Sequence, residues 1–113
     1  MADKPIILII EDDHTISNFI RVALTARDYA CVEASTGRVG LMMLTSRHPD
    51  VVLLDLGLPD IDGTEVLKEI RSFSQVPVIV VTARGQENEK AQTLDNGADD
   101  YLCKPFSMVE LMA

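Results

Sequence analysis

The residues Pro-Ile-Ile-Leu-Ile-Ile-Glu-Asp-Asp, at positions 5–13, contain the pattern that decides the fold. The apolar run Ile6–Ile10 is continuous rather than alternating with polar residues, which predicts a strand buried on both faces of a parallel sheet. Similar runs occupy Val51–Leu54, Val76–Val81 and Tyr101–Cys103, and a weaker one occupies Tyr29–Ala34. We therefore expect five buried strands.

Segments with helical periodicity lie between these runs. The clearest spans His14–Arg27, where apolar residues at i, i+3, i+4, i+7 and i+8 predict one buried face: Ile16, Phe19, Ile20, Ala23 and Leu24. Further helices are expected around residues 39–44, 66–70, 86–96 and 107–112. The helix at 86–96 has one large apolar residue, Leu94, so it should be the least firmly held, with Gly97 at its C-cap. The alternation predicts an α/β fold with right-handed crossovers, as one domain over residues 1–113.

Composition and charge narrow the class of function. The 113 residues are 47% apolar and 25% charged, which excludes a disordered chain, and no apolar run approaches the roughly 18 residues of a membrane span. The first residues lack the apolar stretch of a signal peptide, so we expect a cytoplasmic protein with free, buried thiols at Cys31 and Cys103. A net charge of −8 without a basic cluster argues against nucleic-acid binding by this chain.

Reactive side chains follow the apolar runs. Glu11 and Asp12 come after the first run, and Asp55, Thr82 and Lys104 come after three later ones. Ligands of an open parallel sheet bind outside the carboxyl ends of its strands, near the point where the strand order reverses. A reversal between the first and third strands would bring Glu11, Asp12 and Asp55 together, with Thr82 and Lys104 approaching from the same edge.

Each of these residues also has a purely structural explanation. Asp12 or Asp13 could cap the following helix, Asp55 could form a turn, Thr82 could end a strand and Lys104 could be solvated. Their joint placement outweighs these explanations.

The charges of these side chains predict a metal ion. Three converging carboxylates carry −3, which one Mg²⁺ together with Lys104 would balance, and oxygen ligands suit that ion. Zinc is unfavoured because neither His14 nor His48 joins a cysteine pair. A metal-bound carboxylate beside a lysine and a hydroxyl suggests phosphoryl transfer to Asp55.

Four motifs resemble the receiver (phosphoacceptor) domain of bacterial two-component response regulators: Ile-Ile-Glu-Asp-Asp at 9–13, Leu-Leu-Asp-Leu-Gly-Leu-Pro-Asp at 53–60, Val-Val-Thr-Ala at 80–83 and Lys-Pro-Phe at 104–106. Gly-Ala-Asp-Asp-Tyr-Leu at 97–102 is similar to the OmpR/PhoB subfamily of transcription regulators, and residues 55–60 are most similar to its potassium-responsive Kdp branch. The resemblance implies a flavodoxin-like (CheY-like), doubly wound parallel sheet of five strands in the order 2-1-3-4-5, with helices on both faces.

The resemblance also implies roles for individual residues. Asp55 is the phosphoacceptor, and Mg²⁺ is held by Glu11, Asp12, Asp55 and the backbone carbonyl of Gly57. Lys104, before a cis bond to Pro105, binds the phosphoryl group, and Thr82 and Tyr101 are the switch pair. Gly57 stands where many receivers carry a larger side chain, a departure that bears on the lifetime of the phosphoryl group.

The implied partners are a sensor histidine kinase and a second copy of the chain. Phosphorylation would drive a homodimer through the fourth helix, fifth strand and fifth helix, with Lys90, Asp99, Asp100 and Glu110 at the interface. From the end of the chain at Ala113 we expect an excised receiver with a truncated last helix, whose winged-helix DNA-binding domain is absent.

Two other functions remain open. Asp60-Ile61-Asp62-Gly63-Thr64 fits the Asp-x-Asp-Gly-Thr motif of haloacid-dehalogenase-like phosphatases. That motif needs its first aspartate at the end of a buried strand, whereas here the strand ends at Asp55 and Pro59 intervenes, so Asp62 is better interpreted as a helix cap. The second alternative is a stand-alone receiver that is never phosphorylated.

Overall fold

The computed structural model describes residues 4–82, 94 and 97–103, with the backbone alone at 82 and 101–103. It contains one parallel sheet of five strands: β1 (Ile6–Ile10), β2 (Ala30–Ala34), β3 (Val51–Leu54), β4 (Val78–Thr82) and β5 (Asp100–Cys103). The strand order is β2-β1-β3-β4-β5, as predicted. Each strand begins and ends within two residues of the ends of its predicted apolar run.

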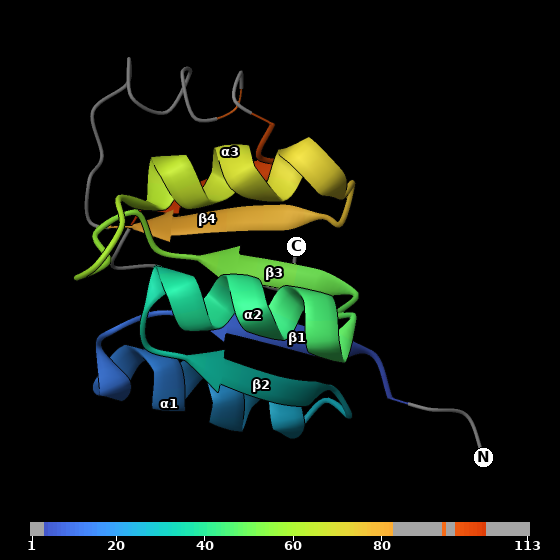
Figure 1. The fold of residues 1–113 in the computed structure, drawn as a ribbon. Helices are drawn as coiled ribbons and strands as arrows, with labels where there is room; N and C mark the ends of the chain where they lie inside the picture. Colours follow the sequence, from blue (N-terminus) through green and yellow to red (C-terminus); the bar gives the residue numbers. More distant parts are fainter. Residues whose placement is uncertain (1–3, 83–93, 95–96, 104–113) are drawn as a thin grey trace.

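Helices cover both faces of the sheet (Figure 1). The described helices are α1 (His14–Thr25), α2 (Gly37–Arg47) and α3 (Gly63–Phe73), with α2 and α3 on one face and α1 on the other. This doubly wound arrangement confirms the predicted α/β class. Within the described ranges, no helix is both long and apolar enough to cross a bilayer.

The core has two layers because successive strand residues face opposite sides of the sheet. Leu8, Ile10, Val52 and Leu54 belong to the larger cluster, which includes the buried apolar side chains of α3. Ile7, Ile9 and Leu53 form the second cluster with Ile20 and Leu24 of α1. These continuous apolar runs are buried on both faces, which explains why they do not alternate with polar residues.

The inner face of α1 differs from its prediction. Phe19 is 51% exposed, whereas Ser17 is buried and donates a hydrogen bond from Oγ to Glu33 Oε1 over 2.6 Å. The contact stripe runs along Ile16, Ile20 and Leu24 with Ser17 on its far side, and successive residues are about 100° apart, so Phe19 falls outside the stripe. The prediction that Phe19 belongs to the buried face was wrong.

The described cysteine is also less buried than predicted. Cys31 is a free thiol of intermediate exposure in β2, and desolvation by partial burial raises its pKa. The side chain of Cys103 lies outside the described residues.

The predicted fourth and fifth helices lie mostly or wholly outside the described residues. Leu94 is helical and 38% exposed. Gly97 follows with a φ of +112°, and its N–H donates to the Leu94 carbonyl over 3.0 Å. A positive φ suits glycine, and this geometry agrees with the predicted C-cap.

Candidate functional site

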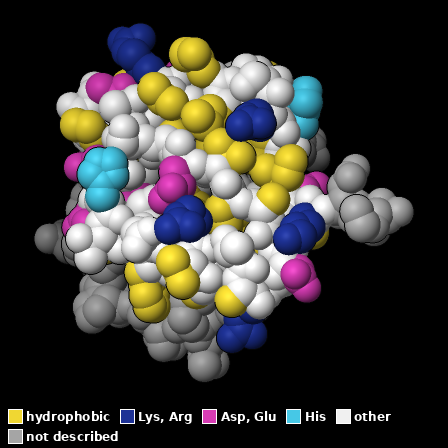
Figure 2. Space-filling model, turned by 90° about the horizontal axis from the view of Figure 1, so that it is seen from below, with side chains coloured by type: hydrophobic (Ala, Val, Ile, Leu, Met, Phe, Trp, Pro, Cys, Tyr) yellow, Lys and Arg dark blue, Asp and Glu magenta, His cyan; other side chains and the backbone are white. Residues whose placement is uncertain are grey.

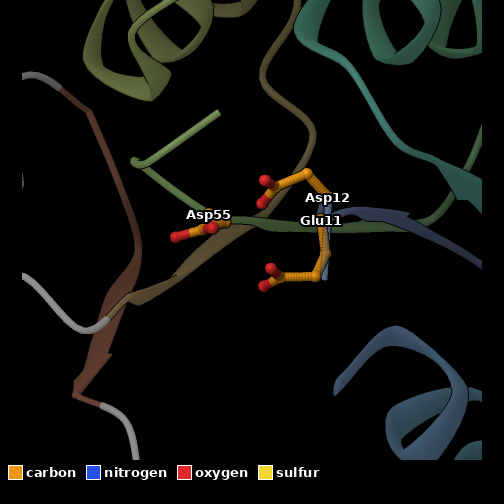
Figure 3. Close-up of side chains that lie close together, drawn as sticks. All are labelled: Glu11, Asp12 and Asp55. Atoms are coloured by element: carbon orange, nitrogen blue, oxygen red, sulfur yellow. The ribbon is translucent and has the colours of Figure 1, made fainter. Parts of the chain in front are cut away.

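Three carboxylates meet at the carboxyl ends of β1 and β3. Each of Glu11, Asp12 and Asp55 offers an oxygen, and these oxygens all lie within 4.8 Å of one another. Figure 3 shows the three side chains extending in the same general direction from the segments that follow the two strands. Glu11 is 4% exposed and Asp55 is 7% exposed, whereas Asp12 is open to solvent. We call these three residues the strand-end cluster.

The strand register explains why these residues converge. Ile10 pairs with Ala34 on one side and with Leu54 on the other. The next backbone amides continue the ladder, because Glu11 N–H donates to the Ala34 carbonyl over 2.9 Å and Asp55 N–H donates to the Ile10 carbonyl over 3.0 Å. The chain leaves β1 toward β2 and returns on the other side of β1 to form β3, so the cluster sits where the strand order reverses.

Backbone amides orient the two buried carboxylates. Asp13 N–H donates to Glu11 Oε1 over 3.2 Å, and Gly57 N–H donates to Asp55 Oδ1 over 3.2 Å. Three carboxylates this close repel one another, and a divalent cation would offset that repulsion. The potential metal ligands among the described residues are all carboxylate oxygens, with no histidine or cysteine in the cluster. Such hard oxygen ligands suit Mg²⁺.

Gly57 leaves space next to the phosphoacceptor candidate. A Cβ built at Gly57 would meet a single described atom within 4 Å, Asp55 Oδ2 at 4.0 Å. A side chain at this exposed position would therefore place its Cβ in van der Waals contact with that oxygen. The glycine therefore keeps one approach to Asp55 open among the described residues.

Gly63 is a site-positioning residue that the sequence analysis did not identify. A Cβ at Gly63 would lie 2.4 Å from both the Asp55 carbonyl oxygen and Leu56 Cα. The Gly63 N–H also donates to the Leu56 carbonyl over 2.8 Å. The start of α3 therefore touches the backbone of the strand-end cluster, and only a residue without a side chain fits this approach.

The two aspartates of the phosphatase-like motif have structural partners. Asp62 is the N-cap of α3, and its Oδ1 accepts from Thr64 N–H over 2.8 Å. Asp60 accepts from Gly37 N–H over 2.8 Å and from Arg38 N–H over 3.0 Å, at the first turn of α2. Desolvation opposes ionisation of Asp60, but these backbone donors hold its pKa below the ordinary value. Neither residue belongs to the strand-end cluster, which favours the capping interpretation over a phosphatase.

The other predicted site residues are only partly described. The register places the backbone of Thr82 beside Cys103, and that of Tyr101 beside Val80, so both strands end at the same edge as Asp55. The side chains of Thr82 and Tyr101 lie outside the described residues, as do Lys104, Lys90 and Glu110.

Arg71 makes a second network that the sequence analysis missed. Its guanidinium donates to the carbonyls of Gly97 over 2.7 Å and Val76 over 2.6 Å, and pairs with Asp99 Oδ2 over 2.9 Å. The same carboxylate oxygen accepts from Val78 N–H over 2.8 Å. The carboxylate of Asp99, just before β5, thus links Arg71 near the end of α3 to the first residue of β4. The sequence analysis predicted Asp99 at a dimer interface, and that role stays a prediction. Its neighbour Asp100 is exposed.

Comparisons with known proteins agree with this arrangement. The family model for the response regulator receiver domain matches residues 7–113. The KDP operon transcriptional regulatory protein KdpE of Escherichia coli K12 is 49% identical over 107 residues, covering 95% of this chain and 48% of that protein. Transcriptional regulatory protein QseB of Haemophilus influenzae is 47% identical over 108 residues, covering 95% of this chain and 49% of QseB. The chain thus spans about half the length of these relatives.

A solved structure gives the same fold. The BeF3-activated N-terminal receiver domain of Klebsiella pneumoniae RstA superposes with a TM-score of 0.91 at 28% identity, covering 95% of this chain and 92% of that one.

Proposed function

We propose that this chain, which belongs to the response regulator receiver domain family, is switched by phosphorylation of Asp55 with Mg²⁺ bound at the strand-end cluster. The observation that carries the proposal is the convergence of Glu11, Asp12 and Asp55 within 4.8 Å at the switch point of the sheet. Of these, Asp55 combines burial, an orienting backbone amide and open space on the side of Gly57.

The chemistry requires little from the protein beyond positioning and charge. A carboxylate oxygen of Asp55 attacks phosphorus, the bond from phosphorus to the kinase histidine breaks, and the imidazole leaves with the electron pair. Mg²⁺ bound to Glu11, Asp12, Asp55 and the Gly57 carbonyl would supply charge stabilisation. We assign Lys104 and Thr82 to the phosphoryl oxygens and Thr82 and Tyr101 to the switch pair, because their strands end at this edge. The domain assists its own phosphorylation and hydrolysis rather than turning over a separate substrate.

The partners follow from the similarity to KdpE and QseB. We assign the protein itself to the cytoplasm and its phosphoryl donor to a sensor histidine kinase of the KdpD type. Because the chain matches about half the length of KdpE, we assign the output to transcription control through a DNA-binding domain outside residues 1–113. We propose regulation of potassium transport on the basis of the 49% identity to KdpE. The identity to QseB, 47%, is nearly as high, so a test of this role must distinguish the two kinds of regulator.

Phosphorylation would promote a symmetric dimer through the fourth helix, β5 and the fifth helix. We assign Lys90, Asp100 and Glu110 to this interface, together with Asp99 once its pairing with Arg71 is exchanged. Sedimentation equilibrium with and without beryllofluoride measures this step. A mass that stays monomeric at high concentration, in a chain extended beyond residue 113, would exclude the dimer.

Intact mass spectrometry tests phosphorylation directly. Incubation with acetyl phosphate and Mg²⁺ should add one labile phosphoryl group, and Asp55→Asn should abolish the gain. A phosphatase would turn the donor over without stable gain, and a receiver that is never phosphorylated would do neither. Full labelling of the Asp55→Asn protein would overturn the assignment of Asp55.

A further inference from the structure

The loop between β3 and α3, residues 55–62, carries both Asp55 and Gly57. The Gly57 N–H donates to Asp55 Oδ1 over 3.2 Å. Gly57 is exposed, and a Cβ built there would meet a single described atom within 4 Å, so close packing by the described residues does not hold it in place. The position of Gly57 beside Asp55 therefore depends on how the rest of the loop is anchored.

Asp60 anchors this loop to the first turn of α2. Its Oδ1 accepts from Gly37 N–H over 2.8 Å and its Oδ2 accepts from Arg38 N–H over 3.0 Å, across 23 and 22 positions of sequence. Hydrogen bonds to an ionised carboxylate are stronger than neutral ones, and the positive end of the helix dipole adds to them. Within the described part of the chain, residues 57–61 make no other hydrogen bond to a segment outside the loop.

The first turn of α2 can lie this close to the loop because its first residue is a glycine. Gly37 is buried, and a Cβ there would lie 2.8 Å from Val66 Cγ2 and 3.4 Å from Asp60 Oδ1. On either side of Asp60, the partly buried Leu58 and Ile61 pack against the larger core cluster. Asp60 is therefore held between two packed side chains and a helix N-terminus, which makes it the fixed point of the loop.

Helix α2 also has an N-cap of its own. Thr36 precedes the helix, and its Oγ1 accepts from Val39 N–H over 3.2 Å. The carboxylate of Asp60 adds to that cap from a distant part of the chain. If Asp60 served only to stabilise the start of α2, its removal would change stability alone. If it holds the loop, its removal also changes the environment of Gly57.

We propose that Asp60 is a positioning residue for the strand-end cluster. By holding the loop on the first turn of α2, it keeps the Gly57 N–H on the carboxylate of Asp55 and the Gly57 carbonyl in place as a ligand for Mg²⁺, an ion that backbone carbonyls suit. The metal-binding part of this inference rests on the proposed function, whereas the placement of Gly57 against Asp55 rests on contacts within the chain.

Amide exchange at Gly57 tests the placement without any metal. In ¹⁵N-labelled, metal-free protein, Asp60→Ala should speed exchange of the Gly57 N–H with water severalfold, because a loosened loop opens its hydrogen bond to Asp55 more often. Thr36→Ala is the matched control, since it removes the other cap of α2 but leaves the loop anchored, and exchange at Gly57 should stay as in the unmodified protein. Unchanged exchange in Asp60→Ala, or an equal increase in Thr36→Ala, would overturn the proposal.

Titration with Mg²⁺ alone tests the consequence for the site. Among the described residues, the strand-end cluster is the one group of three or more acidic, histidine or cysteine side chains close enough to hold a metal ion. On the face seen from below, Figure 2 shows Asp and Glu scattered among Lys and Arg rather than gathered, so amide shifts around the cluster report the binding. Asp60→Ala should weaken Mg²⁺ binding by about tenfold, the low end of the loss from changes behind a metal ligand. Asp60→Asn keeps one acceptor oxygen and should give an intermediate affinity.

Asp62→Ala is the control for charge. It removes one carboxylate and one helix cap from the same loop, so a general loss of negative charge or of stability would weaken Mg²⁺ binding equally in both alanine variants. We expect Asp62→Ala to bind Mg²⁺ as the unmodified protein does. If Asp60→Ala keeps the full affinity, or if Asp62→Ala loses as much, the proposal fails. If the unmodified protein shows no saturable binding, the metal site of the proposed function fails instead, and exchange at Gly57 still decides the role of Asp60.

Discussion

The acidic side chains of the strand-end cluster and those at the helix N-termini are chemically alike but occupy opposite environments. Glu11, Asp12 and Asp55 face one another within 4.8 Å, so each adds to its neighbours' repulsion. Asp13 and Asp62 instead accept hydrogen bonds from the first turns of α1 and α3.

Adjacent residues can fall into different classes. Asp13 Oδ1 accepts from Thr15 N–H over 3.0 Å, whereas Asp12, one position earlier, joins the strand-end cluster. Helix N-termini provide unpaired donors and positive potential, while the strand ends here gather negative charge. A carboxylate that faces backbone amides at a helix N-terminus therefore stabilises this fold, whereas a carboxylate that faces other carboxylates destabilises it. Only the second kind needs a cation to offset the repulsion.

The largest expected effect tests the contact between the N-terminus of α3 and the strand-end cluster. Gly63→Ala places a Cβ 2.4 Å from the Asp55 carbonyl oxygen, so α3 and its cap must move from the strand-end cluster. We expect a loss of about 1–3 kcal/mol or more in the free energy of unfolding, measured by urea denaturation. Gly57→Ala is the matched control, because within the described ranges its Cβ meets a single atom, Asp55 Oδ2 at 4.0 Å, and it should change stability by less than about 0.5 kcal/mol. Equal effects at the two glycines would remove the steric argument.

The next effect is the response to Mg²⁺. Binding to the native state alone stabilises by about 2.7 kcal/mol at a hundredfold excess over the dissociation constant, so millimolar Mg²⁺ should raise the melting temperature of chelator-treated protein. Asp12→Ala should stabilise the metal-free protein by relieving repulsion and should reduce the Mg²⁺ response. If that variant keeps the full Mg²⁺ shift in a thermal melt, Asp12 is not a ligand.

Removal of a helix cap should destabilise the metal-free protein, in contrast to the stabilisation expected of Asp12→Ala. Asp62→Ala leaves Thr64 N–H without its side-chain acceptor and should cost about 1 kcal/mol in the free energy of unfolding, with little change in the Mg²⁺ response. The contrast with Asp12→Ala, measured in the same metal-free buffer, sharpens the comparison. A stabilising Asp62→Ala would show that this carboxylate is also strained.

The smallest effect concerns the pH dependence of Asp60. Its folded-state pKa lies below the unfolded value, so its contribution is present above the unfolded pKa and is lost as the pH falls through the folded pKa. Asp60→Asn should therefore lower the melting temperature at pH 7, and the difference should shrink as the pH falls below about 4. A difference that stays constant over this range would mean that the charge of Asp60 contributes nothing.

The sequence by itself determined the strands and the position of the site. Five apolar runs predicted five strands because burial on both faces leaves no room for alternation. Glu11 and Asp55 could be placed together because the carboxyl ends of parallel strands meet at one edge, whatever the details of packing. The sequence also predicted a cap at Asp62 and one at Asp12 or Asp13, since a cap bonds to amides two or three residues away, and the structure places the second at Asp13.

Only the tertiary structure decided contacts between distant segments. Asp60 accepts from Gly37, 23 positions earlier, and Arg71 pairs with Asp99, 28 positions later, so no local pattern identifies either partner. Helical periodicity predicted which side of α1 faces the sheet but not how many residues around the helix are buried. For that reason Phe19 was wrongly assigned to the buried face. The need for glycine at Gly63 arises from a backbone 2.4 Å from its absent Cβ. Local preferences act over a few residues, whereas close packing depends on the neighbours that the whole fold brings together.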